Sequence, residues 1–427
     1  MSDFSVPQIK KLLLLKSWNQ GSIGRVLNIY WLFLAWPFIS IGNSLSFYFF
    51  LLLLVVINRN GGSIAPGFKG FWTWILLAFG AVAIGSTFFS PMSETFSDEL
   101  NAAKLVLQVV YWLFLVLFIV KNAEKINLYL MCKYLTIGTW IVVGQYFFFN
   151  FIGQAPFIIS VGRNSMVFTM LALMPFHAYY ILKRFGKLGL WLYLPCTILV
   201  MLSSEGRAGV LLIVFQSALV FFSAINRGLN FFAKLVFLLC LVTIATFYND
   251  ENRLSLAYAL APISPRISTF IEGSGQAGDL NKDESWLTRK LMIRKGKEII
   301  EEYPLFGIGL MNFSNYEAQL SALWEKDFIP LQDEHDATNH FNRASSHNSY
   351  LQIWCELGYV GLILFLLLLA PLLIYLFHKI FFGVLSPTEL PLIALLFICI
   401  HFYVISTITS ALSWFVIGFA YAVFKRR

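Results

Sequence analysis

Charged residues are scarce in this chain of 427 residues. Asp, Glu, Lys and Arg together make up 13% of it, whereas hydrophobic residues make up 58% and the mean hydropathy is +0.71. Soluble domains contain about 25% charged and about 45–50% apolar residues. A fold surrounded by water cannot bury this much apolar surface, so the composition excludes a soluble globular protein. It predicts an all-α, polytopic integral membrane protein in which lipid surrounds most of the chain.

Several common catalytic and metal-binding motifs are also missing. The chain has no Walker A sequence, no GxSxG and no HExxH, which excludes the common ATPase, serine-hydrolase and zinc-protease interpretations. Its five cysteines have no CxxC or CxxxC spacing, so we predict neither a disulfide nor a thiolate metal site. The run QDEHDATNH offers acidic and imidazole ligands, but its spacing fits no metal site and a hydrated loop is the better interpretation. We predict no metal and no cofactor.

The apolar segments are long enough for membrane spans, each of which needs about 20 residues. The pattern predicts about twelve spans, near residues 26–42, 44–57, 71–88, 103–121, 129–152, 164–182, 188–204, 207–225, 232–249, 357–377, 390–406 and 410–424. Lys and Arg are concentrated in every second connection and in both tails, so both termini are predicted to be cytoplasmic. The net charge of +8 therefore belongs mostly to short loops and does not indicate a nucleic-acid partner. The predicted division is a tail at 1–25, nine spans within 26–249, a periplasmic loop at 250–347, three spans within 348–424 and a tail at 425–427.

The long loop at 250–347 is too polar to lie within the membrane. It holds 15 of the 23 acidic residues and 10 of the 31 basic residues. A helix is predicted near 284–303, with polar N-cap candidates at its start and Pro304 as its stop signal. In the following LFGIG, Gly307 and Gly309 predict a tight turn.

Three arginines near this outer face are candidates for binding an anion. Arg207 lies at the outer end of a predicted span, where an arginine is costly and usually has an anionic partner. Its guanidinium can bind a pyrophosphate through two hydrogen bonds, or it can pair with Glu205 or a lipid phosphate instead. Arg289 and Arg294 lie on the predicted loop helix, where they either form part of a solvated basic face or reach a shared site. Because they are five residues apart, we expect only one of them to point at such a site.

A histidine stands immediately before the tenth predicted span. The imidazole of His347 titrates near neutral pH and can accept a proton from a sugar hydroxyl. The side chains of Ser345, Ser346 and Asn348 can orient it or cap the helix that starts there. The alternative is an ordinary interfacial histidine without a chemical role.

These residues resemble a known family, the O-antigen ligase and O-antigen polymerase superfamily of bacterial envelope membrane proteins. The ligase pattern has a histidine and a small polar residue, then nine positions, a glycine, two positions and a small residue or tyrosine. This chain has a similar pattern in His347-Asn348, Gly358 and Gly361, with the same gaps of nine and two residues. Arg207 in GRAG resembles the arginine that family members carry at the outer end of a span. Arg289, fifteen residues before the proline of PLFGIG, stands in the place of a second family arginine.

The resemblance implies a metal-independent glycosyltransferase in the bacterial inner (plasma) membrane, with its active site facing the periplasm. Such proteins transfer a glycan from undecaprenyl pyrophosphate to a hydroxyl acceptor, and the lipid pyrophosphate serves as the leaving group. Carried over residue by residue, His347 is implied to be the base, and Arg207 and Arg289 to bind the pyrophosphate. Arg294 and Asn348 are further candidates for substrate binding. The implied partners are the donor glycan lipid, an acceptor that is either lipid A–core or a second lipid-linked glycan, and membrane lipid.

Two acceptors remain open within this superfamily. Polymerases often carry an arginine, fifteen residues and a glycine in two outer loops. At that spacing this chain has Tyr179 after Arg163, Leu305 after Arg289 and Leu310 after Arg294. This difference favours a ligase, whereas HNSYLQIWCELGYVGL is similar to polymerases and exopolysaccharide proteins. Two interpretations of another class are a transporter of lipid-linked glycans and a non-catalytic assembly scaffold. The transporter would need a polar path through the bundle, for which Lys133 is one of few charged candidates.

Overall fold

The described part of the chain is a bundle of helices. The computed structural model describes residues 21–35, 45–60, 70–90, 99–152, 163–202, 207–225, 258, 268, 284–318, 345–382, 385–403 and 405–425. All regular secondary structure in these ranges is helical, as the sequence predicts. The predicted span 232–249 and the run QDEHDATNH lie outside the described residues.

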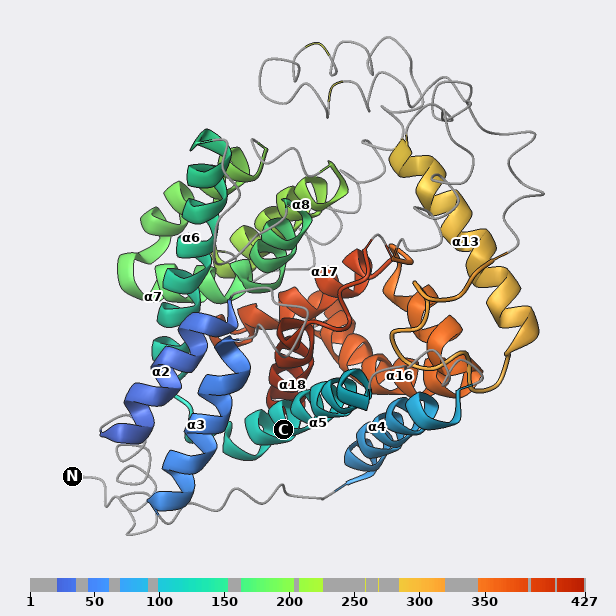
Figure 1. The fold of residues 1–427 in the computed structure, drawn as a ribbon. Helices are drawn as coiled ribbons and strands as arrows, with labels where there is room; N and C mark the ends of the chain where they lie inside the picture. Colours follow the sequence, from blue (N-terminus) through green and yellow to red (C-terminus); the bar gives the residue numbers. More distant parts are fainter. Residues whose placement is uncertain are drawn as a thin grey trace.

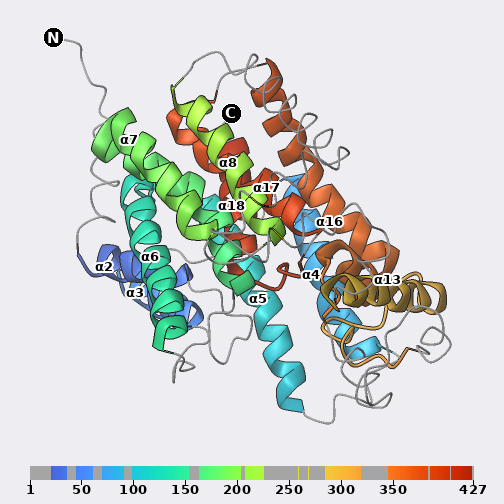
Figure 2. The same cartoon turned by 90° about the horizontal axis from the view of Figure 1, so that it is seen from above.

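The helices form two groups around a centre (Figures 1 and 2). One group consists of α2 (Ser22–Leu34), α3 (Leu45–Arg59), α6 (Leu128–Ile152), α7 (Arg163–Leu202) and α8 (Arg207–Ile225). The other consists of α4 (Phe71–Phe89), α16 (Ser349–Phe382) and α13 (Glu284–Glu302), and α13 packs against α16 at the edge of the molecule. Between them lie α5 (Glu99–Asn122), the short 3-10 helix η3 (Pro387–Leu392), α17 (Ile393–His401) and α18 (Ala411–Lys425).

Aromatic side chains fill the centre around α18. Trp414 is fully buried and stacks on Trp112 of α5, with the ring centroids 5.5 Å apart. Its indole N–H donates a hydrogen bond of 2.8 Å to the carbonyl of Ile408, so its one polar atom is satisfied. A large aromatic side chain contributes most when its area is buried and its polar atom has a partner. These contacts fix α18 as the core helix against which the two groups pack.

Four helices in the described ranges are long and apolar enough to cross a membrane. They are Phe71–Phe89, Ala103–Asn122, Asn164–Leu202 and Ser349–Ile380. Five shorter apolar helices coincide with further predicted spans, at Ser22–Leu34, Ser46–Arg59, Leu212–Ala224, Pro387–His401 and Ala411–Lys425. The described residues therefore form an all-helical protein of the membrane type, while the total of twelve spans stays a prediction.

Two of the long helices contain a glycine that breaks the helical path. α7 covers the predicted spans 164–182 and 188–204, and Gly186 separates them with φ 68° and ψ −163°. α16 has the same kind of break at Gly358, with φ 64° and ψ −166°. A positive φ is readily adopted by glycine and costly for other residues. The break in α16 divides a short first part, beginning at Ser349, from a long apolar second part.

Candidate active site

The first part of α16 begins with a side-chain cap directly after His347. The backbone N–H of Leu351 donates to Oδ1 of Asn348 at 3.0 Å, which is the N-cap to N3 bond that satisfies one free donor of a helix start. Asn348 is therefore the N-cap of α16. Its side-chain oxygen serves the helix, while Arg294 and Asn348 remain predictions as substrate-binding residues.

His347 has an unusual backbone conformation for a residue other than glycine. Its φ is 49°, and in the described part of the chain only Met311 shares this property. Ser346 bridges the backbone around it, since its hydroxyl donates to the carbonyl of Asn348 at 2.9 Å. The same hydroxyl lies 2.5 Å from Oγ of Ser406 in the connection between α17 and α18. A left-handed conformation costs about 1–2 kcal/mol, so these hydrogen bonds define the direction in which the imidazole leaves the chain.

Ser349 attaches the start of α16 to the same connection. This buried serine donates its backbone N–H to the carbonyl of Phe402 at 2.7 Å. Its hydroxyl donates to the carbonyl of Ile405 at 3.0 Å and accepts the N–H of Thr407 at 2.9 Å. Three bonds from one residue thus hold the chain that follows the histidine.

The electrostatic surroundings keep the imidazole of His347 in its neutral form. Burial first, and then the positive charge of Arg289, lowers the pKa of His347 below its ordinary value of 6.5. Both causes disfavour the imidazolium form, because burial removes water and a like charge repels. At neutral pH the ring therefore has an unprotonated nitrogen, which is the form that accepts a proton.

The same interaction shows which loop arginine lies near the histidine. Arg289, on the first half of α13, is close enough for its charge to act on His347. Arg294 is five residues further along, which on an α-helix is a rotation of about 140°. The structure thus brings the charge of Arg289 near His347, and which of the two arginines binds substrate stays a prediction. Arg207 is the first residue of α8, and its side chain lies outside what the structure describes.

The turn after α13 is bound to the break in α16 by an exchange of backbone hydrogen bonds. In an unbroken helix, the N–H groups of residues 359 and 360 would donate to the carbonyls of residues 355 and 356. Here those two N–H groups donate to the turn instead, at 2.8 Å to Pro304 and 3.2 Å to Leu305. The two carbonyls accept from the turn in return, at 3.0 Å from Ile308 and 2.9 Å from Gly309. The PLFGIG segment and the glycine of the histidine motif therefore form one structural unit.

Glycine is required on both sides of this exchange. A Cβ on Gly358 would overlap the carbonyl group of Leu305, and a Cβ on Gly307 would overlap the backbone of Cys355 and Glu356. Both glycines also have positive φ, at 64° and 68°. The spacing of nine residues from Asn348 thus places the break where the loop helix can be fixed beside the histidine.

Two buried groups that the sequence analysis did not single out support the same turn. Glu356, 1% exposed, accepts the backbone N–H of Phe313 at 3.3 Å and the amide of Gln352 at 3.1 Å. Lys295 of α13 is fully buried, and its ammonium lies 5.1 Å from the ring centroid of Phe313. Burial lowers the pKa of Lys295 from 10.5 to about 8. A carboxylate within the apolar run WCELGYVGL was the available signal for Glu356, because a charge there needs partners.

The end of α4 contacts the turn from a third direction. The hydroxyl of Ser90 donates to the carbonyl of Ile308, and the hydroxyl of Ser86 accepts the N–H of Leu310 at 3.3 Å. The turn between residues 304 and 313 is therefore held by α4 and α16 together. This places the end of α4, the turn and the start of α16 at one end of the bundle, and the periplasmic orientation of this end stays a prediction.

The fold and this site define a class, an all-helical membrane protein with a neutral histidine and an arginine where a loop helix meets a broken span. Residues 148–366 match the family model described as O-antigen ligase, which covers about half of the chain. No curated protein matches the chain. The match includes α7, α8, α13 and the first part of α16, with all five candidate residues. The chain belongs to the O-antigen ligase family, as its motifs predict.

Proposed function

We propose that the protein transfers a glycan from undecaprenyl pyrophosphate to a hydroxyl group at the periplasmic face of the inner membrane, as an O-antigen ligase whose acceptor is lipid A–core. The observation that carries the proposal is the pairing of His347 with Arg289 where α16 begins. A neutral imidazole near a guanidinium suits a reaction that removes a proton from one substrate and leaves negative charge on the other.

In this reaction, His347 takes the proton of the acceptor hydroxyl through its unprotonated ring nitrogen. The acceptor oxygen forms a bond to the anomeric carbon as the bond between that carbon and the pyrophosphate oxygen breaks. The electron pair of the broken bond leaves with undecaprenyl pyrophosphate, and the proton on His347 returns to water. No nucleotide is needed, because the leaving group is already activated.

The arginines act on the leaving group. Arg289 binds the pyrophosphate and stabilises the charge that grows on it, and Arg207 does the same from the start of α8. Loss of one such contact typically costs about 10²–10³ in rate. The guanidinium is suited to this role because it donates two parallel hydrogen bonds to phosphate oxygens, which an ammonium cannot do. The reaction uses no metal, so transfer by the purified protein should survive EDTA.

A polymerase that joins lipid-linked repeat units is the second candidate. The stretch HNSYLQIWCELGYVGL favours it, since it is similar to polymerase sequences. The missing arginine–glycine spacing in the outer loops favours the ligase.

Gene deletion followed by gel analysis of lipopolysaccharide and of lipid-linked glycan separates the two candidates. Loss of a ligase leaves long chains on undecaprenyl pyrophosphate and core without polymer. Loss of a polymerase leaves core that carries a single repeat. Unchanged lipopolysaccharide and unchanged lipid-linked glycan would contradict both.

A further inference from the structure

A cavity of about 360 Å³ lies at the end of the bundle opposite the candidate active site. α16 connects the two places, because it begins after His347 and ends shortly before η3, which lines the cavity. From Gly358 to Phe382 a helix rises about 36 Å, which is close to the thickness of a membrane. The cavity is therefore separate from the His347 site.

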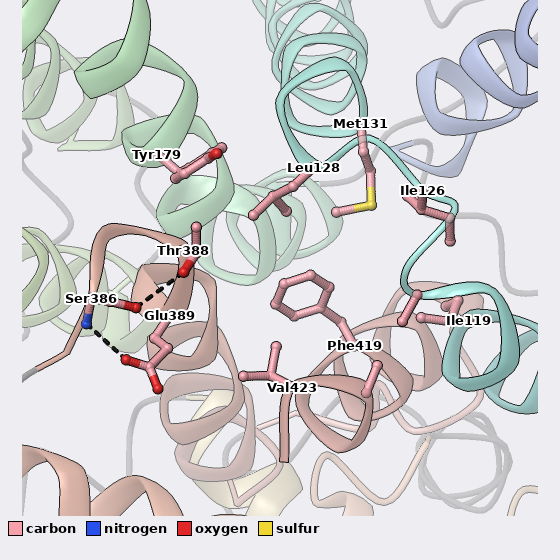
Figure 3. Close-up of a pocket in the computed structure, with 12 residues that line it drawn as sticks. Ile119, Ile126, Leu128, Met131, Tyr179, Ser386, Thr388, Glu389, Phe419 and Val423 are labelled. Atoms are coloured by element: carbon pink, nitrogen blue, oxygen red, sulfur yellow. Dashed lines mark hydrogen bonds between the residues drawn. The ribbon is translucent and has the colours of Figure 1, made fainter. Parts of the chain in front are cut away.

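Most of the cavity wall is apolar. Figure 3 shows Leu128 and Met131 of α6 beside Phe419 and Val423 of α18, with α5 closing the same side. These side chains come from the ends of several helices, so the cavity opens where spans reach the membrane surface. An apolar wall at the end of the membrane spans fits a hydrocarbon chain better than a sugar or a nucleotide.

The opposite wall offers hydroxyl groups (Figure 3). Tyr179 of α7 lines the cavity and is only 6% exposed. A phenol hydroxyl on a cavity wall can donate a hydrogen bond to a ligand oxygen. The carboxylate of Glu389 is already occupied, since it accepts from the backbone of Ser386 at 2.8 Å and pairs with Lys379 at 3.5 Å. The Tyr179 hydroxyl is therefore the group of this wall that can bind an ester oxygen.

Basic residues lie next to the lining residues in the sequence. Lys125 and the acidic Glu124 stand between Ala123 and Ile126, both of which line the cavity, and Lys121 lies in the last turn of α5. Lys425 ends α18, two residues after Val423. Lysines at the membrane surface attract anionic headgroups. Lys121, Lys125 and Lys425 outnumber Glu124 and Glu389, so the charge at this end favours a lipid phosphate.

We propose that this cavity binds one anionic phospholipid of the phosphatidylglycerol type. An acyl chain occupies the apolar part, the Tyr179 hydroxyl donates to an ester oxygen, and the phosphate lies beside Lys125. The proposal is independent of the glycan-transfer reaction.

Native mass spectrometry of the full chain in a nonionic detergent tests the proposal by titration with phosphatidylglycerol and, separately, phosphatidylethanolamine. We expect the wild type to retain one phosphatidylglycerol at least fivefold more tightly than phosphatidylethanolamine. Leu128→Trp fills the cavity and should lose this lipid. The control Leu107→Trp, at an exposed position on α5 about 18 Å from the lining residue Ile119, should keep it.

Two milder variants keep the test valid if Leu128→Trp does not fold. Tyr179→Phe removes only the hydroxyl and should weaken retention about two- to tenfold, the value of one hydrogen bond. Lys125→Gln should weaken it about fivefold and reduce the preference for the anionic lipid. Equal retention of the two lipids by the wild type, or unchanged retention in Tyr179→Phe and Lys125→Gln, would overturn the proposal.

Discussion

The two parts of α16 on either side of Gly358 differ in what they bury. The short first part buries polar side chains, namely Ser349, Gln352 and Glu356. Ser349 and Glu356 bond to neighbouring segments, and the amide of Gln352 donates to Glu356 within the helix. The long second part exposes large apolar side chains, such as Ile363 and Ile374 at 54% and 68%. The first part is built to hold groups in place, and the second to face lipid. One helix thus joins a site to a membrane anchor, and the glycine break keeps the two roles apart.

Among changes near the first part of α16, removal of the proposed base His347 should reduce glycan transfer the most. We expect His347→Ala to reduce glycan transfer about 10²–10⁴-fold, because the acceptor hydroxyl then lacks a general base. The measurement is transfer by purified protein, together with a gel of lipopolysaccharide from a complemented deletion strain. The matched control is His378→Ala, an exposed histidine near the other end of α16, which should be fully active. Normal polymer from His347→Ala would show that the histidine is only interfacial.

Substitution of Gly358, at the break in α16, should have the next largest effect on glycan transfer. Gly358→Ala places a Cβ against Leu305 at a strained φ, so the turn can no longer exchange hydrogen bonds with α16. We expect transfer to fall about tenfold or more and the amides of residues 304–313 to exchange faster with solvent. Gly144→Ala is the control, since a Cβ there meets nothing within 4 Å. If amide exchange and transfer both stay at the wild-type level, the turn does not position the loop helix.

The smallest expected effect is that of the buried Lys295 on the pH dependence of stability. Burial holds the pKa of Lys295 at about 8, whereas in the unfolded chain it is near 10.5. Between these values the unfolded chain binds a proton that the folded chain does not, so stability rises as pH rises through this window. We expect the Tm of the wild type to rise from pH 8 to pH 10 relative to Lys295→Met. Parallel Tm curves for the two proteins would contradict this.

Much of the helical fold and of the candidate site could be predicted from the sequence. Apolar runs and lysine-rich connections indicated the helices, and the ordered set Arg207, Arg289, His347, Gly358 indicated the family, which the match over 148–366 confirms. The exchange of backbone bonds could not be predicted, because it joins segments about 50 residues apart and has no local periodicity. The left-handed backbone of His347 was also beyond prediction, since it depends on Ser346 and Ser406, which are 60 residues apart.

The pH–rate profile of transfer tests the central claim most directly, namely that Arg289 faces His347 and adds to the effect of burial in lowering its pKa. The wild type should lose activity only as the pH falls through the lowered pKa of His347, below 6.5. Arg289→Gln removes a like charge, so the pKa of His347 should rise and the acid limb should move to higher pH, in addition to any loss of rate. Arg294→Gln should leave the limb where it is. An unmoved acid limb in Arg289→Gln, or an equal shift in Arg294→Gln, would contradict the account.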